Sequence, residues 1–258
     1  MGSFFHIFFR YNILIIQVIL LKILIKNILL NYEVSGFGSP IILLHGWGKD
    51  LHTFDNLAKQ LNEDYIIYQL DLPGFGLSEI NEPLTIKDYA DIVNEFCLSL
   101  AIINPIVIGH SFGGRVALKY ASCYSINKLV LISSPGLKRR FNVFIWLKIM
   151  IYKICKRINL KVKMGSEDYQ KSTPVMKDIL VKALNTEQSD DAIKVNCPTL
   201  LLYGRKDKTV PLYIGKKLKN LIPQTTFFEI KKCGHFPYIE RFRFTLIVLK
   251  SFLYGEKI

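Results

Sequence analysis

The feature that most constrains this chain is a sharp strand-to-helix turn at residues 109–114, Gly-His-Ser-Phe-Gly-Gly. The apolar run 106–108 predicts a buried strand, and a helix-forming run at 115–121 follows with no room for a loop. Small residues let the chain fold straight back, which forces Ser111 into a strained conformation with its hydroxyl exposed at the carboxyl edge of a sheet. The Phe112 N–H then lies at the first turn of the helix, where unpaired donors and the dipole favour an oxyanion. By itself, the motif is equally compatible with a glycine-rich turn that carries a bystander serine.

A serine hydroxyl is a weak nucleophile at neutral pH, so it needs a base to take its proton and an acid to orient that base. Of the five histidines in the chain, only His235 comes after Ser111. It follows the strand-like run 225–230 and precedes a helical pattern, so we expect it on a loop at a strand end. Asp207 follows the apolar run 199–202, which predicts a position in the loop after another strand. The three candidates therefore occur in the order Ser, Asp, His, each just past a predicted strand.

This order resembles that of the α/β-hydrolase superfamily. Three further segments are similar to motifs of that family: His-Gly-Trp-Gly at 45–48, Asp-Leu-Pro-Gly-Phe-Gly-Leu-Ser at 71–78 and Gly-His-Phe-Pro-Tyr-Ile-Glu at 234–240. The resemblance covers nearly everything from about residue 23 to the end. It implies an α/β fold, with a mostly parallel eight-stranded sheet, helices on both faces and a helical lid inserted after the sixth strand.

The resemblance also implies roles for individual residues. Ser111, Asp207 and His235 would form a catalytic triad, and the backbone N–H groups of Trp47 and Phe112 would form the oxyanion hole. It implies neither a metal nor an organic cofactor. The expected substrate pocket takes residues from the oxyanion loop, the lid and the histidine loop, namely His45, Gly46, Phe141, Trp146 and Phe236.

The cations around Asp207 are a departure from the family pattern. Arg205, Lys206 and Lys208 flank it, where relatives often carry acidic or neutral residues. Such cations favour the ionised carboxylate, but they could also draw it away from His235. Some relatives carry the acid after the sixth strand instead. Here the predicted sixth strand, 128–132, is followed by Ser-Ser-Pro-Gly, so Asp207 remains the candidate.

Strand and helix patterns alternate along the chain, as a parallel sheet requires. We expect a core made of residues 21–136 and 197–258, with a helical lid at 137–196 and a hydrophobic extension outside the fold at 1–20. The predicted strands are a first pair within 22–36, then 40–44, 65–70, 106–108, 128–132, 199–202 and 225–230, and the predicted helices include 51–61, 86–101 and 174–184.

Two segments have apolar sequences that suggest a membrane surface. Residues 11–21 form an apolar run too short to span a bilayer, so residues 1–20 are expected either to come from an upstream start codon or to contact a membrane. The first lid helix, 141–158, is apolar with cations at intervals, and no acid occurs between Lys138 and Lys163. It is interpreted either as packing on the core with solvated lysines or as a weak contact for anionic membranes.

Composition narrows the class of protein. The 34 Lys and Arg residues exceed the 21 Asp and Glu residues, which gives a net charge of +13. No nucleic-acid motif accompanies that charge, so we expect no nucleic-acid partner and attribute the excess to a lysine-rich proteome. The five cysteines are odd in number and lack metal-ligand spacing, which favours reduced thiols and a cytoplasmic location, with peripheral membrane association as an alternative.

The sequence thus predicts a serine hydrolase that cleaves an ester-type bond of a small, apolar acyl substrate through an acyl-enzyme intermediate. One alternative is an acyltransferase that uses the same triad, because only the group that resolves the acyl-enzyme differs. The other is a non-catalytic ligand-binding protein that keeps the hydrolase fold. The natural substrate and the oligomeric state are not predicted.

Overall fold

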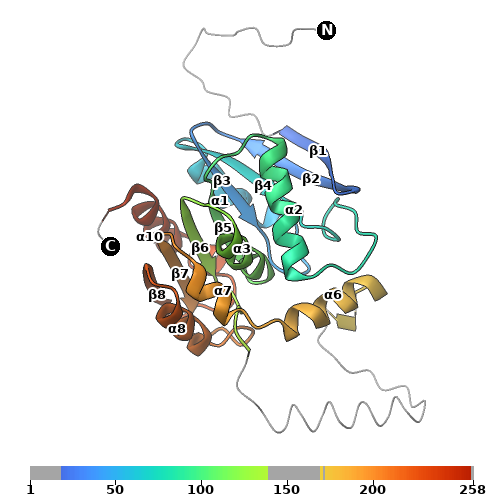
Figure 1. Ribbon diagram of the computed structural model, residues 1–258. Coiled ribbons are helices and arrows are strands. Elements are labelled where there is room, and N and C mark those ends of the chain that lie inside the picture. Colours follow the sequence, from blue (N-terminus) through green and yellow to red (C-terminus); the bar gives the residue numbers. More distant parts are fainter. Residues whose placement is uncertain (1–18, 139–168, 171, 257–258) are drawn as a thin grey trace, which may run out of the picture.

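The computed structural model describes residues 19–138, 169–170 and 172–256, and its centre is a twisted eight-stranded sheet (Figure 1). The strand order is β1-β2-β4-β3-β5-β6-β7-β8. Only the β1–β2 and β2–β4 pairs are antiparallel, so β2 runs against all the other strands. The predicted mostly parallel sheet is confirmed. The strands are β1 Ile19–Ile25, β2 Ile28–Ser35, β3 Ser39–Leu44, β4 Tyr65–Leu70, β5 Ile106–His110, β6 Lys128–Ile132, β7 Thr199–Gly204 and β8 Thr225–Ile230.

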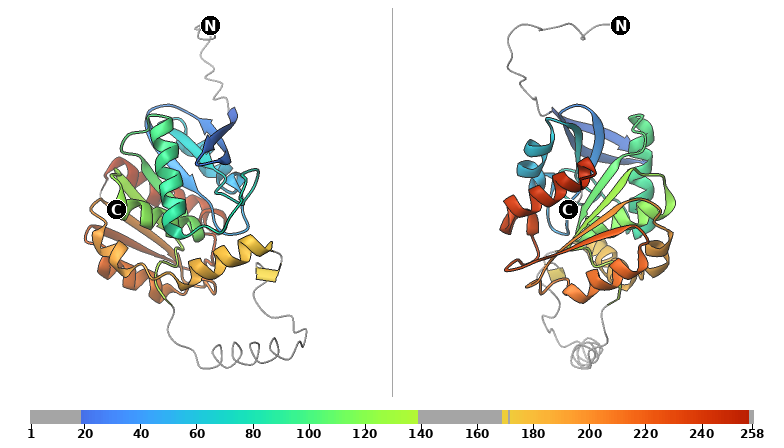
Figure 2. Two further views of the ribbon diagram at one scale, coloured as in Figure 1. Left: turned by 45° about the vertical axis from the view of Figure 1, so that its right-hand side comes forward. Right: turned by 90° about the vertical axis from the view of Figure 1, so that its left-hand side faces the viewer.

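Helices cover both faces of the sheet because the central strands are apolar on both sides. Alternate residues of a strand point to opposite faces, and in β3 Ile42 and Leu44 pack in one core cluster while Ile41 and Leu43 pack in the other. The right-hand view of Figure 2 shows α10 on one side of the sheet and α2 on the other. The helices are α1 Asp55–Leu61, α2 Ile86–Ser99, α3 Phe112–Cys123, α6 Pro174–Asn185, α7 Ser189–Lys194, α8 Leu212–Leu221, α9 Pro237–Glu240 and α10 Phe242–Tyr254, with a 3-10 turn η1 at Leu51–Phe54.

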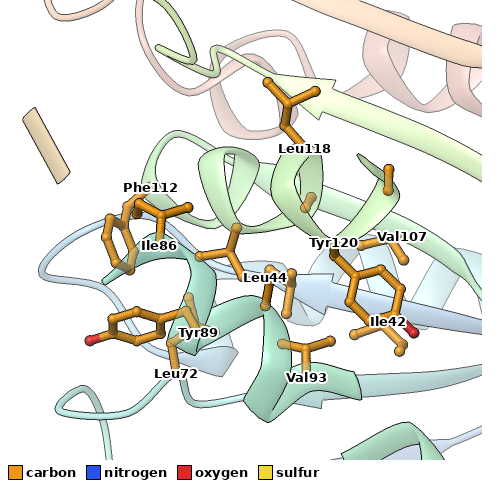
Figure 3. Packing of buried hydrophobic residues seen from close by; sticks show 14 of the residues in the cluster. Ile42, Leu44, Leu72, Ile86, Tyr89, Val93, Val107, Phe112, Leu118 and Tyr120 are labelled. Carbon is orange, nitrogen blue, oxygen red and sulfur yellow. The ribbon is translucent and has the colours of Figure 1, made fainter. Parts of the chain in front are cut away.

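The first core cluster lies beneath α2 and α3 and fixes the helix that follows the turn at Ser111. Figure 3 shows Ile42, Leu44 and Val107 of the strands facing residues of those two helices. Two rings from different helices, Tyr89 and Phe112, meet edge to face with centroids 5.1 Å apart. Because this packing is dense, the amino end of α3 is held rigidly against the sheet.

Several predicted boundaries differ from the structure. The predicted helix 51–61 begins as the turn η1 and becomes α1 only at Asp55, and α2 ends at Ser99 rather than at 101. The predicted extension 1–20 overlaps β1, because Ile19 pairs with Val34 and Leu20 with Glu33 in the β1–β2 ladder. Backbone pairing with β2 thus places Ile19 and Leu20, which were expected outside the fold, in the sheet.

The predicted lid segment is only partly within the described residues. The first lid helix, including Phe141 and Trp146, lies outside them. At the other end of the segment, the buried Arg115 of α3 donates from Nη1 to the carbonyl of Thr186 at 3.0 Å, and Lys119 of α3 pairs with Asp191 of α7 at 2.7 Å. Residues 186–194 therefore pack against α3, which is part of the core. Among the described helices, none combines the length and the apolar character that crossing a bilayer requires.

Candidate active site

The turn between β5 and α3 holds Ser111 in a strained conformation. Its φ of 50° and ψ of −110° lie outside the regions that residues with a side chain prefer. Glycine is required on both sides, because a Cβ at Gly109 would lie 2.5 Å from the carbonyl oxygen of Gly113, and one at Gly113 would lie 2.1 Å from that of Leu44. The predicted sharp turn is present, and it puts Ser111 at the carboxyl edge of the sheet.

Three side chains from three strand ends meet at this edge. The Oγ of Ser111 lies 3.0 Å from Nε2 of His235, and Nδ1 of His235 lies 2.7 Å from Oδ2 of Asp207. An ionised carboxylate only accepts hydrogen bonds, so Nδ1 carries the proton of the neutral ring. Nε2 is then free to accept the hydroxyl proton of Ser111. The structure thus brings together all three residues that the sequence proposed for a triad.

The carboxylate of Asp207 is fixed by more than His235. Its side chain is fully buried, and its Oδ1 accepts from the backbone N–H groups of Thr209 at 2.7 Å and Val210 at 2.8 Å. Burial opposes ionisation, but the hydrogen bonds from His235 and these amides outweigh it and hold the pKa of Asp207 below its ordinary value. Asp207 is therefore an anion that is oriented at both oxygens.

The flanking cations do not pull Asp207 from His235. Arg205 turns to Glu229 of β8, with Nε 3.1 Å from Oε1. Lys206 uses its backbone N–H to bind the carbonyl of Cys233 at 2.8 Å, which ties the loop after β7 to the loop that carries His235. Although three cations flank Asp207, its Oδ2 stays 2.7 Å from Nδ1 of His235.

Two backbone N–H groups are candidates for binding an oxyanion. Phe112 is the first residue of α3, and Trp47 lies in the loop after β3. That loop is tied to the helix, because the N–H of Gly113 donates to the carbonyl of His45 at 3.0 Å. Within the described ranges, neither the Phe112 nor the Trp47 N–H is bonded to a protein group. Both donors are therefore available near Ser111.

The predicted pocket role of His45 is wrong in this structure. The ring is fully buried, Nδ1 donates to the carbonyl of Gly46 at 2.8 Å, and Nε2 accepts from the N–H of Leu72 at 3.0 Å. Burial lowers the pKa of His45, so the neutral ring ties the loop after β3 to the turn after β4. Gly46 does lie at the site, because a Cβ there would be 3.4 Å from the Cβ of Ser111.

The remaining pocket predictions have different outcomes. Phe236 is half-buried beside the imidazole, with its ring centroid 5.2 Å from that of His235. The exposed Lys49 places Nζ 5.5 Å from the centre of the Phe236 ring. Phe141 and Trp146 lie outside the described residues, so their place in the pocket stays a prediction.

The motif at 71–78 contributes scaffold rather than a reacting group. The carboxylate of Asp71 is almost fully buried and accepts from the N–H groups of Leu51 and Leu77 and from the side-chain amide of Asn31, each at 2.8 Å. Gly76 must be glycine, because a Cβ there would overlap this carboxylate. Asp71 thus fixes the turn to which His45 is hydrogen-bonded.

Two residues near the base were missed by the sequence analysis. His110 donates from Nε2 to the backbone carbonyl of His235 at 2.9 Å, and Glu240 accepts from the backbone N–H groups on either side of His235. Both belong to motifs that the sequence showed, Gly-His-Ser and Gly-His-Phe-Pro-Tyr-Ile-Glu. Their targets are backbone groups, and residue patterns alone do not indicate those.

Among the described residues, one group could hold a metal ion. Glu33, His52 and Asp55 bring three ligand atoms within 4.8 Å of one another, and His52 and Asp55 are exposed. The group shares no residue with the site at Ser111.

The chain is similar to known hydrolases in both sequence and fold. A curated relative from Vibrio cholerae, named pimeloyl-(acyl-carrier protein) methyl ester esterase, is 26% identical over 81% of this chain and 92% of that protein. The AB hydrolase superfamily protein YisY of Bacillus subtilis is 27% identical over 83% of this chain and 91% of its own length. The solved structure of a thermophilic esterase from Thermogutta terrifontis shares the fold, with a TM-score of 0.72 and 22% identity over 92% of this chain and 98% of that one. The sequence model of the alpha/beta hydrolase family matches residues 41–244, and the chain therefore belongs to that family and is a hydrolase.

Proposed function

We propose that the protein is a serine esterase that acts through an acyl-enzyme intermediate. The observation that carries the proposal is the unbroken chain of hydrogen bonds from Ser111 through His235 to Asp207, at 3.0 and 2.7 Å. A hydroxyl, a neutral imidazole and a fixed carboxylate in this order make up the machinery of acyl transfer. The chain's membership of a hydrolase family also supports this proposal.

In the first half of the reaction, the Oγ of Ser111 attacks the ester carbonyl carbon while Nε2 of His235 takes the hydroxyl proton. Asp207 stabilises the imidazolium that forms, since its carboxylate is already ionised and oriented. The carbonyl oxygen becomes an oxyanion and accepts from the N–H groups of Phe112 and Trp47. The tetrahedral intermediate then collapses, the ester C–O bond breaks, and His235 gives its proton to the leaving alcohol.

In the second half, water attacks the acyl-enzyme. His235 takes a proton from the water, the bond between the acyl carbon and the Oγ of Ser111 breaks, and the proton passes back to that oxygen. The products are a carboxylic acid and the free enzyme. If another alcohol replaces water in this step, the same residues perform acyl transfer, which is the alternative activity.

The substrate class that we propose is an ester of a small, apolar acyl group. Aromatic rings surround the oxyanion loop, with Trp47 packed edge to face on Phe75 at 5.0 Å and on Phe112 at 5.2 Å. The ring of Phe236 lies next to that of His235. The curated relative from Vibrio cholerae is named as a methyl ester esterase, which supports a simple alkyl ester rather than an amide.

Turnover of nitrophenyl esters of increasing acyl length tests the proposal. We expect release of nitrophenol with a preference for short apolar chains, and a loss of at least ~10⁴-fold in kcat in Ser111→Ala. Ser122→Ala, at the carboxyl end of the same helix, is the matched control and should retain wild-type turnover. Adding alcohol acceptors separates the alternatives, because an acyltransferase forms a new ester at the expense of the acid. A folded wild-type protein without turnover on any ester would favour the binding protein.

A further inference from the structure

The side chain next to the proposed nucleophile reaches the main chain of the proposed base. His110 is 1% exposed, and its Nε2 lies 2.9 Å from the backbone carbonyl oxygen of His235, which is 125 residues away. A carbonyl only accepts, so Nε2 carries the proton. Nδ1 is then the acceptor of the neutral ring, and the hydroxyl of Tyr238 lies 3.3 Å from it. Both ring nitrogens of His110 are thus used within the protein.

The ring of His110 is neutral near pH 7. Burial, and then the nearby ring of His235 at 4.8 Å, lower the pKa of His110 to about 3. A neutral ring with one defined donor can hold a carbonyl without placing a positive charge against the imidazolium that forms during catalysis. The site therefore contains two histidines in contact, of which only His235 faces Ser111.

A second side chain binds the same peptide segment through its backbone N–H groups. One carboxylate oxygen of Glu240 accepts from the N–H of Gly234 at 2.7 Å, and the other accepts from the N–H of Phe236 at 3.0 Å. Together with His110, Glu240 binds the backbone on both sides of His235 and at its carbonyl. Glu240 belongs to α9, directly after the loop, whereas His110 belongs to β5.

We propose that His110 and Glu240 form a backbone clamp that positions the imidazole of His235 over Ser111. This inference rests on the proposed function. His110 is covalently adjacent to Ser111, so a bond from its ring to the His235 carbonyl links the main chain of the nucleophile directly to that of the base. His110 and Glu240 are positioning residues, because neither lies against the reacting atoms.

The clamp makes a specific prediction for substitutions at position 110. Glutamine can present an amide N–H where the His Nε2–H now stands, whereas leucine fills similar space without a donor. We expect His110→Leu to lower kcat by about 10²-fold with KM changed by no more than about twofold, since displacements near 1 Å have this cost. His110→Gln should recover most of that loss. Equal defects in both variants, or a wild-type kcat in His110→Leu, would overturn the clamp.

Position 240 provides a second test, whose measurement does not depend on catalytic activity. Glu240→Gln keeps one acceptor but turns an NH₂ group toward the other N–H, so hydrogen–deuterium exchange of residues 233–236 should become faster than in the wild type. His110→Leu should have the same effect on that peptide, and residues 199–204 of β7 should be unchanged in both variants. Unchanged exchange at residues 233–236 in both variants would overturn the clamp, whether or not the wild type has esterase activity. An inactive wild type whose variants show accelerated exchange would overturn only the proposed function.

Discussion

Replacing Asp207 with asparagine changes one atom of the triad, and the structure dictates how the amide must sit. Oδ1 of Asp207 accepts two backbone N–H groups, those of Thr209 and Val210. In Asp207→Asn the amide oxygen must take that place, because an NH₂ group there would face two donors. The NH₂ group is then forced toward Nδ1 of His235, which can only accept from it.

The consequence is a reversal of the tautomer of His235. With Nδ1 as acceptor, Nε2 carries the proton and points it at Ser111, so the ring cannot take the hydroxyl proton. A template triad loses ~10⁴-fold in kcat from this substitution. At 1.36 kcal/mol for each factor of ten, the loss corresponds to about 5 kcal/mol of transition-state stabilisation. KM should change little, because the side chain of Asp207 is fully buried.

Steady-state hydrolysis of a short nitrophenyl ester measures this effect, with melting temperature as the check on folding. Asp191→Asn is the matched control, since it removes the same charge from a carboxylate that pairs with Lys119 away from Ser111. We expect the control to retain turnover within about twofold, because the Asp191 carboxylate bonds to Lys119, Ser122 and Gln188 and to no member of the triad. If Asp207→Asn retained wild-type kcat with an intact fold, the tautomer argument would be refuted and another carboxylate would have to be the acid.

Three further predictions concern stability. Gly113→Ala should lower the melting temperature by several degrees in a thermal scan, because the new Cβ would lie 2.1 Å from the Leu44 carbonyl oxygen. Overpacking of this kind costs about 1–3 kcal/mol. An unchanged melting temperature would contradict this prediction. Thr85→Ala should cost about 1 kcal/mol in denaturant unfolding, since Thr85 and Asp88 form a capping box at α2, and a change below about 0.3 kcal/mol would argue against the cap. Folding lowers the pKa of Asp207, so its carboxylate stabilises the fold above its ordinary pKa of 3.8 and loses this effect as the pH falls through the folded value. The difference in unfolding free energy between wild type and Asp207→Asn should therefore narrow in acid, and a difference that widened would contradict the sign.

Periodicity and turn chemistry predicted the parallel part of the sheet well, because buried parallel strands are short apolar runs bounded by clear breaks. The predictions 65–70, 128–132 and 225–230 coincide with β4, β6 and β8. The β1 edge of the sheet was harder to predict. Ile19 and Leu20 of β1 belong to an apolar run that continues upstream in the sequence, so the pattern offers no start signal, and it is their pairing with β2 that places them in the sheet.

The site residues also include some that the sequence could predict and some that it could not. Ser111, Asp207 and His235 could be proposed from the sequence because each follows a strand, and the carboxyl ends of parallel strands meet at one edge. The role of His45 could not be predicted, since its partners are the backbone groups of Gly46 and Leu72. Contacts from a side chain to a distant backbone leave no trace in residue spacing, and the same holds for His110.

The measurement that tests the central claim most directly is covalent capture of Ser111. A fluorophosphonate reacts only with a serine whose hydroxyl proton can be removed, and it releases fluoride as the Oγ–phosphorus bond forms. We predict one adduct per chain in the intact mass of the wild type, located at Ser111 by peptide mapping, absent in Ser111→Ala and strongly reduced in His235→Ala. A folded wild-type protein that stays unlabelled, or equal labelling of Ser111→Ala, would contradict the account.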